Sequence, residues 1–246
     1  MKRFIYFFTL FALMCSCSDE VLNEGKTQKM FGRPYATLSF DSITAPNVWS
    51  QYQSLEEMLE ACQIPEDKLK SMSTDELIEV CMSHPLHFIY SAYNNELRGA
   101  DVIIRNFNGF SELARRTDAA GKLLNFYDEI FSESVQQDPS FIGRSDISHI
   151  GFIELYIASK ALPSLYEDDN LIKLEKISDN ILSQKIETKR ADLFSVRHSF
   201  LIKAQVKLAK SCISKDDATI LKNFLRVGGN LNNPQDYTNI SIILNK

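Results

Sequence analysis

Apolar positions recur every three or four residues through most of the chain, which is the spacing of one face of an α-helix. From Ser54 onward this pattern predicts helices almost throughout. Ser54 with Glu57, and Ser73 with Glu76, are capping boxes that predict the starts of two short helices. A long helix is predicted after Pro85, a good first-turn residue. Its apolar stripe consists of Ile89, Tyr93, Leu97, Ala100, Ile104 and Phe107.

The second half of the chain continues the helical pattern. Further helices are predicted at about 118–137, 146–162, 169–187, 191–214 and 216–226. The helix at 146–162 is apolar on nearly every side, as expected of a central buried element. Gly228-Gly229 predicts a C-terminal helix cap, and 240–244 is predicted to pack as a strand or an irregular closure. The predicted fold class is therefore all-α, a multi-helix bundle or a short helical array.

The start of the chain has a different pattern. Lys2 and Arg3 precede an apolar run at 4–14, which is too short to span a bilayer but typical of a signal peptide. Met14-Cys15-Ser16-Cys17 resembles the lipobox of bacterial lipoproteins, in which the last cysteine carries the lipid. Cys17 fits better than Cys15, which would place bulky Met14 at the cleavage site. The resemblance implies a signal peptide at 1–16 and a membrane anchor through lipid on Cys17; the alternative is an ordinary cleaved signal peptide.

Two short motifs after Cys17 resemble sorting and modification signals of Bacteroidetes. Ser18-Asp19-Glu20 is similar to the acidic signal that directs lipoproteins to the outer face of the outer membrane. Asp41-Ser42-Ile43 fits the O-glycosylation pattern of the same bacteria, which makes Ser42 a candidate site. Glycines and prolines interrupt the segment 17–47, so we predict a lipidated tether there and an α-helical domain at 48–246.

Net charge and the absence of common motifs argue against several classes of function. Removing Lys2 and Arg3 with the signal leaves 25 basic residues (27 minus 2) against 32 acidic ones, a net charge of −7. This balance argues against binding of nucleic acid or of anionic lipid headgroups. Gly-x-Ser-x-Gly, His-Glu-x-x-His, Cys-x-x-Cys and Gly-rich phosphate loops are absent from the sequence. We therefore predict no cofactor, and binding rather than catalysis.

Cysteine usage excludes a disulfide framework. Once Cys15 and Cys17 are assigned to the signal, Cys62, Cys81 and Cys212 remain, an odd number. Buried thiols are the favoured interpretation. A Cys62–Cys81 bridge is the alternative.

Glu154 is the first candidate for chemistry, because it lies within the apolar sequence of the 146–162 helix. A carboxylate in such a place is costly unless it is paired, and burial raises its pKa. That is the profile of a general acid or of a ligand-binding group in a pocket. The favoured alternative is an internal ion pair with Arg197 or His198.

Cys81, His84 and His87 are candidate metal ligands, because thiolate and imidazole both bind zinc. Pro85 separates the two histidines, however, and no fourth ligand follows at a regular spacing. The alternative, a helix boundary with two partly exposed histidines, is therefore preferred.

Tyr90, Asn94, Asn95 and Arg98 form a candidate ligand-binding cluster, since tyrosine, amide and guanidinium groups are typical of recognition surfaces. The alternative is that Asn94 and Asn95 line a helix–helix contact. Trp49 with Tyr52 is either an exposed aromatic platform or a seal on the core.

The segments 72–81, 84–86 and 107–113 resemble a group of secreted helical proteins of Bacteroidetes, over about residues 50–130. That group has no assigned activity, so the resemblance implies origin and fold and no site. The leading hypothesis is an outer-membrane lipoprotein that binds a protein or glycan partner at the cell surface. The alternatives are a cell-envelope hydrolase that uses Glu154, and an envelope immunity or assembly factor.

Overall fold

The computed structural model describes residues 29–30, 33–34, 38, 40–136, 144–187 and 196–245. Over these residues the protein is all-α except for two paired antiparallel strands, β1 (Lys29–Met30) and β2 (Arg33–Pro34). The predicted signal peptide, Cys17 and the acidic triplet at 18–20 lie outside the described residues. None of the helices in the described ranges is long and apolar enough to cross a membrane.

The first half of the domain contains mostly short helices. They are α2 (Asp41–Thr44), α3 (Pro46–Trp49), α4 (Leu55–Ala61), α5 (Glu66–Ser71), α6 (Thr74–Met82), the 3-10 helix η2 (His87–Ala92), α7 (Glu96–Asn106) and α8 (Asn108–Leu113). Strands β1 and β2 and helices α2 and α3 begin within the segment 17–47, so the predicted irregular tether contains more regular structure than expected.

The second half of the domain contains longer helices. They are α9 (Ala119–Gln136), α10 (Arg144–Ser159), the 3-10 helix η4 (Pro163–Tyr166), α11 (Asp168–Glu187), α12 (Val196–Lys210), α13 (Lys215–Arg226) and α14 (Pro234–Leu244).

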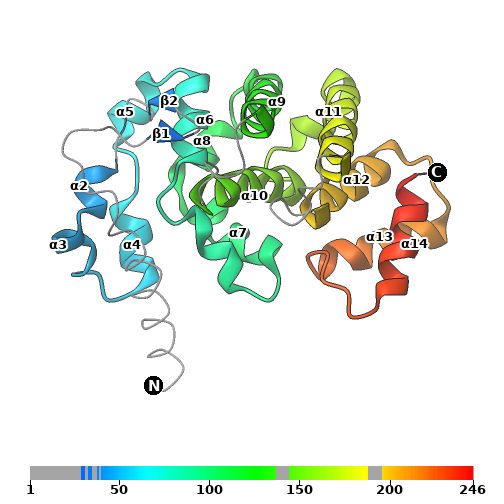
Figure 1. Cartoon of the computed structure of the whole chain (residues 1–246). Helices are drawn as coiled ribbons and strands as arrows, with labels where there is room; N and C mark the ends of the chain where they lie inside the picture. Colours follow the sequence, from blue (N-terminus) through cyan, green and yellow to red (C-terminus); the bar gives the residue numbers. More distant parts are fainter. Residues whose placement is uncertain are drawn as a thin grey trace.

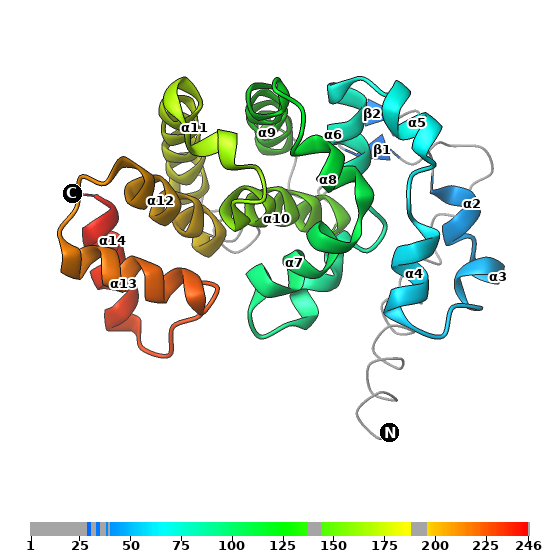
Figure 2. The same ribbon diagram turned by 180° about the vertical axis from the view of Figure 1, so that it is seen from behind.

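Helix α10 lies across the middle of the molecule (Figure 1). Helices α9 and α11 lie on one side of it and α7 lies on the other, while α2–α4 and α13–α14 occupy opposite ends, as the reverse view also shows (Figure 2). The side chains from Phe152 to Ala158 are all buried, including Glu154. The prediction of a central buried helix is confirmed, and the architecture is an elongated helical array.

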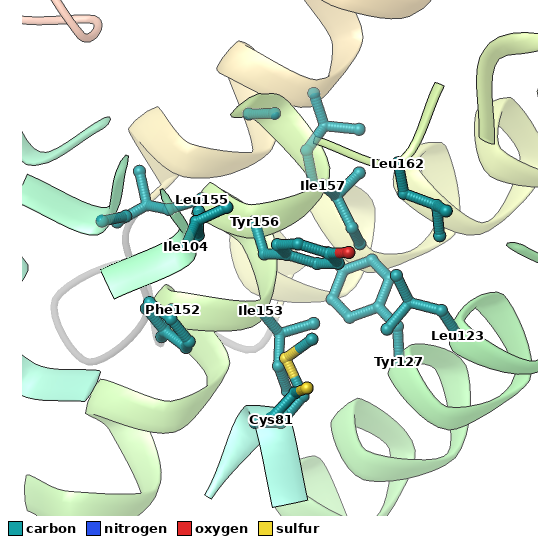
Figure 3. Close-up of a cluster of buried hydrophobic side chains, with 14 of the residues drawn as sticks. Cys81, Ile104, Leu123, Tyr127, Phe152, Ile153, Leu155, Tyr156, Ile157 and Leu162 are labelled. Atoms are coloured by element: carbon teal, nitrogen blue, oxygen red, sulfur yellow. The ribbon is translucent and has the colours of Figure 1, made fainter. Parts of the chain in front are cut away.

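The core around α10 joins several helices. In the close-up, Cys81 of α6, Ile104 of α7 and Tyr127 of α9 converge on Tyr156 and its neighbours in α10 (Figure 3). Each of these side chains is at most 6% exposed. Burying a large apolar side chain contributes about 1.5–3 kcal/mol, so this cluster fixes α10 against the helices around it.

The long helix predicted after Pro85 does not form as one element. The chain makes η2, and Tyr93 then adopts an extended conformation before α7 starts at Glu96. Asn95 caps α7, because its side chain accepts a hydrogen bond from the backbone N–H of Arg98. The turn folds η2 back against α7, and a Cβ added at Gly99 would lie 2.7 Å from the Tyr90 Cα.

The segment 240–244 is also helical, contrary to the prediction of a strand or irregular closure. Helix α14 begins with Asn233 as N-cap and Pro234 in its first turn. Ile240, Ile243 and Leu244 are buried at the spacing of one helix face.

The predicted cap at Gly228-Gly229 is confirmed. Both glycines have positive φ, +66° and +71°. The Gly229 N–H donates to the Phe224 carbonyl and the Gly228 N–H to the Leu225 carbonyl, each at 2.9 Å, which is a Schellman motif at the end of α13.

Candidate functional site

Glu154 is completely buried and fully engaged by neighbouring donors. Lys185 Nζ of α11 donates to both of its carboxylate oxygens at 2.7 Å. Tyr127 of α9 and Ser199 of α12 donate to Glu154 Oε1 at 2.7 and 2.9 Å. The predicted internal ion pair is therefore present, but its cation is Lys185 and not the predicted Arg197 or His198.

The buried position of Lys185 has a signal in the sequence. The buried residues of α11 include Leu174, Ser178, Ile181 and Lys185, a stripe with steps of four, three and four. A lysine that falls on such a stripe needs a buried acceptor. Burial lowers the pKa of Lys185, although the Glu154 carboxylate opposes this effect.

Arg197 and His198 pair with a different carboxylate, Glu96 at the start of α7. Arg197 Nη2 and His198 Nε2 both contact Glu96 Oε2, the latter at 2.6 Å. Burial alone would raise the pKa of Glu96, but the hydrogen bond and charge of His198, with those of Arg197, hold it below its usual value. His198 Nδ1 is 4.0 Å from Glu154 Oε2, so the imidazole lies between two carboxylates.

This arrangement cross-links the array. Glu154 connects α10 to α9, α11 and α12, and Glu96 connects α7 to α12. A general acid must contact its substrate and carry a transferable proton. Because both Glu154 oxygens accept from fixed internal donors and the residue is 0% exposed, its surroundings favour the structural ion pair over the hydrolase.

His84 and His87 are buried, so the prediction of partly exposed histidines was wrong. The His84 ring packs beside Phe107, and its Nδ1 accepts from the Leu86 N–H. His87 stacks on His149, with ring centroids 3.6 Å apart. Burial lowers the pKa of His84 to about 3, and burial together with His149 lowers that of His87 well below the usual range.

The candidate zinc ligands are not brought together. The two histidines face different aromatic neighbours, and Cys81 lies against Gly109 of α8. Burial raises the pKa of the Cys81 thiol well above its usual value. Within the described ranges, no group of three or more His, Cys, Asp or Glu side chains is arranged to hold a metal ion. Cys62 and Cys81 are free buried thiols and Cys212 is a free exposed one, so the Cys62–Cys81 bridge is excluded.

Three residues of the predicted ligand-binding cluster, Tyr90, Asn94 and Asn95, form hydrogen bonds to distant parts of the chain. Tyr90 is buried and donates to the Ser148 carbonyl at 3.3 Å. Asn95 Nδ2 donates to the Arg226 carbonyl at 3.0 Å, and Asn230 Nδ2 donates to the Asn94 carbonyl at 3.1 Å. The alternative of an inter-element contact is therefore correct for Asn94 and Asn95, while Arg98 is exposed.

A surface groove lies between α13 and α14, and we call it the terminal groove. It has a cavity volume of about 430 Å³, within the range of ligand pockets. Its lining consists of Ile220, Asn223, Phe224, Arg226, Val227, Leu231, Asp236, Asn239 and Ile240. The groove does not follow from a strand or irregular closure at 240–244, although Asn233-Pro234 is a recognisable helix start.

The loop at the end of the terminal groove is fixed. Tyr237 Oη donates to the Gly229 carbonyl at 2.8 Å and accepts from the Leu231 N–H at 3.2 Å. Asn230 holds the same loop, and Asn95 the end of α13, against the start of α7. The groove is thus formed before any partner arrives.

The remaining candidates have simpler surroundings. Trp49 and Tyr52 meet edge to face, with ring centroids 5.7 Å apart, and both are half-buried against the core. Ser42 is exposed on α2.

Comparison with known proteins adds no relative: no family model, no curated protein and no solved structure matches the chain.

Proposed function

We propose that this chain is a lipid-anchored cell-envelope protein whose helical domain binds a protein partner through the terminal groove. The observation that carries the proposal is the groove itself. It combines the exposed Ile220 with Arg226 and Asp236, neither of which forms an ion pair within the described part of the chain. Apolar contact with a few placed polar groups is the composition of a recognition site.

The predicted lipid anchor supports the proposal of a protein that binds its partner at the cell surface. Lipid on Cys17 would anchor the domain, and Ser18-Asp19-Glu20 favours the outer face of the outer membrane. The negative charge of the mature chain gives no attraction to anionic headgroups, so the lipid is needed for attachment. From that face, the domain would meet other surface proteins.

A protein is the preferred partner, for two reasons. Glu154, the best candidate for hydrolysis, is engaged by Lys185, Tyr127 and Ser199. Trp49 and Tyr52, the aromatic pair that could support a sugar ring, pack against each other and the core. The envelope immunity or assembly factor remains compatible with this proposal, because either would act by binding a protein.

The anchor is tested by fractionating cells that express the full chain or Cys17→Ala. The wild-type protein is expected with outer membranes and accessible to surface labelling, and the variant in the soluble fraction. Retention of Cys17→Ala in membranes would contradict the address.

The groove is tested by affinity capture from surface-labelled cells with Ile220→Asp. Ile220 is 42% exposed in the groove, so the substitution places a charge at the binding surface without disturbing the core. Ile172→Asp is the matched control, because Ile172 is 66% exposed on α11 outside the groove. Loss of a captured protein only in Ile220→Asp is expected. Equal capture by both variants, or specific binding on a glycan array, would overturn the proposal.

A further inference from the structure

Three of the four histidines of the chain lie together where η2 meets α10. His87, the first residue of η2, stacks on His149 of α10, and its Nδ1 is 2.9 Å from the carbonyl oxygen of His84. All three side chains are at most 7% exposed. The contact between η2 and α10 is therefore made in part by buried titratable groups.

Hydrogen bonds define where the protons of two of these rings lie. His87 Nδ1 carries a hydrogen, because the His84 carbonyl oxygen can only accept. His84 Nδ1 carries none, because it accepts from the Leu86 N–H. An additional proton on His87 would therefore go to Nε2, which is buried and has no hydrogen-bond partner among the described residues. The closed structure provides no acceptor for that proton.

The groups that face His87 would repel a positive charge. They are His149 on α10 and His84 in the turn before η2, and both become cations when they are protonated. Burial and His149 lower the pKa of His87 well below 6.5. The folded arrangement is therefore fully favoured above pH 6.5 and loses stability progressively as the pH falls below this value.

The carboxylates of the helices packed against η2 do not compensate such a charge. These helices are α7 and α10, and their described carboxylates all pair with cations outside the histidine cluster. The pairs are Glu96 with Arg197 and His198, Asp101 with Arg105, and Glu154 with Lys185.

Helix η2 is weakly held compared with the helices around it. It is a 3-10 helix of six residues, and 3-10 hydrogen bonds have poorer geometry than those of an α-helix. The hydrogen bond from Tyr90 Oη to the Ser148 carbonyl of α10 is long, at 3.3 Å. The extended conformation of Tyr93 separates η2 from α7, so η2 can move without unwinding that helix.

We propose that the His87–His149 stack is an acid-sensitive switch, which holds η2 against α10 at neutral pH and releases it in acid. Release lets His87 bind its proton in water. It also exposes Ile89 and Tyr90, which are buried in the closed structure. This inference goes beyond the proposed function and does not depend on the partner of the terminal groove.

The test measures amide hydrogen exchange of the full chain in detergent at pH 7 and pH 5, with protection corrected for the intrinsic exchange rate at each pH. The N–H groups of His87, Ile89 and Tyr93 donate within the η2 segment. Their protection should fall by about twentyfold or more, because one histidine that is protonated only in the open form changes the opening equilibrium by up to about tenfold per pH unit. Protection in α9 and α12 should stay unchanged.

Two variants separate titration from packing. His87→Phe keeps an aromatic ring against His149 but does not titrate, so its protection in η2 should fall much less between the two pH values. Phe88→Leu is the matched control, because it alters the packing of the same 3-10 helix and removes no titratable group. Its acid-induced loss of protection should equal that of the wild type.

Histidine ring NMR of the wild type gives a readout that needs no substitution. The His87 signals should titrate over the same pH range in which η2 loses protection. Equal η2 protection at pH 7 and pH 5, or an equal acid-induced loss in His87→Phe and the wild type, would overturn the proposal. A loss of protection that extends equally over α9 and α12 would also overturn it, because the whole domain would then be unfolding.

Discussion

At the scale of single residues, the Glu154–Lys185 pair has the largest energetic consequences. Both side chains are at most 1% exposed, so removing them from water costs several kcal/mol per ion. The pair is tolerable because Tyr127 and Ser199 supply further hydrogen bonds. Ser199 also accepts from Lys185 at 2.9 Å, which closes the network.

This network predicts strong coupling between its two ions. Glu154→Gln and Lys185→Met should each lower the free energy of unfolding by about 3–5 kcal/mol, because each leaves a buried partner unpaired. The double variant should lose clearly less than the sum of the two. Urea unfolding measures all three. Additive losses would mean that the ions do not depend on each other.

The buried imidazole of His84 should make the folded state less stable in acid. Its folded pKa is about 3, against 6.5 for an ordinary histidine, so the folded state binds a proton less readily than the unfolded chain. Its contribution to stability is complete above pH 6.5 and is lost progressively as the pH falls toward 3. Between these values, His84 alone should lower the free energy of unfolding by about 1.4 kcal/mol per pH unit.

The measurement compares urea unfolding at pH 7 and pH 5 for the wild type and His84→Asn. Asparagine keeps an acceptor for the Leu86 N–H but does not titrate, so the variant should lose less stability on acidification. The slope between the two pH values, rather than the stability at either, is the quantity compared. An unchanged slope would show that His84 is not the group responsible.

At the scale of elements, the caps were the most predictable features. Ser73 and Glu76 form the complete capping box. Ser54 accepts from the Glu57 N–H as predicted, but the Glu57 carboxylate accepts from the Gln53 N–H, so only half of the second predicted box forms. These motifs act within a few residues, so the sequence carries them in full. The break between η2 and α7 was not predicted, because the apolar stripe continues through it and only tertiary packing at Gly99 reveals the turn.

The candidate site was less predictable than the fold. Burial of Glu154 follows from its apolar helix, but its partner Lys185 is 31 positions away, a separation that local pattern does not resolve. Asn95 illustrates the same limit. Its capping role is local, whereas its bond to the Arg226 carbonyl spans 131 positions.

At the scale of elements, replacing glycine by alanine should have opposite effects on the free energy of unfolding at two helical positions. Gly121→Ala in α9 should raise the free energy of unfolding by about 0.5 kcal/mol, because glycine disfavours helix and the nearest atom to the new Cβ is 4.0 Å away. Gly109→Ala in α8 should lower it by about 1–3 kcal/mol. Its Cβ would lie 2.5 Å from Phe107 and 2.9 Å from Cys81.

Thermal and urea unfolding of the two alanine variants measure this contrast, and each serves as the control for the other. Similar stability changes of the same sign would contradict the close packing of α8 on α6.

At the scale of the whole molecule, the terminal groove depends on how the end of the array is held. Helices α13 and α14 pack on α12, and the end of α13 and the connecting loop are attached to the start of α7. The two contacts come from distant parts of the chain and meet beside Glu96, which binds Arg197 and His198. Helix α12, whose Ser199 donates to Glu154, therefore also positions the groove.

Asn95→Asp tests this attachment without removing the cap of α7. A carboxylate still accepts from the Arg98 N–H, but it has no N–H to donate to the Arg226 carbonyl. Amide hydrogen exchange in α13 and α14 should accelerate, while exchange in α9–α11 stays unchanged, because local opening is confined to the released unit. Asn94→Asp adds the same charge one residue earlier, where the side chain is exposed and the bond to Asn230 uses the backbone carbonyl. Equal acceleration in both variants would assign the effect to charge rather than to the lost hydrogen bond.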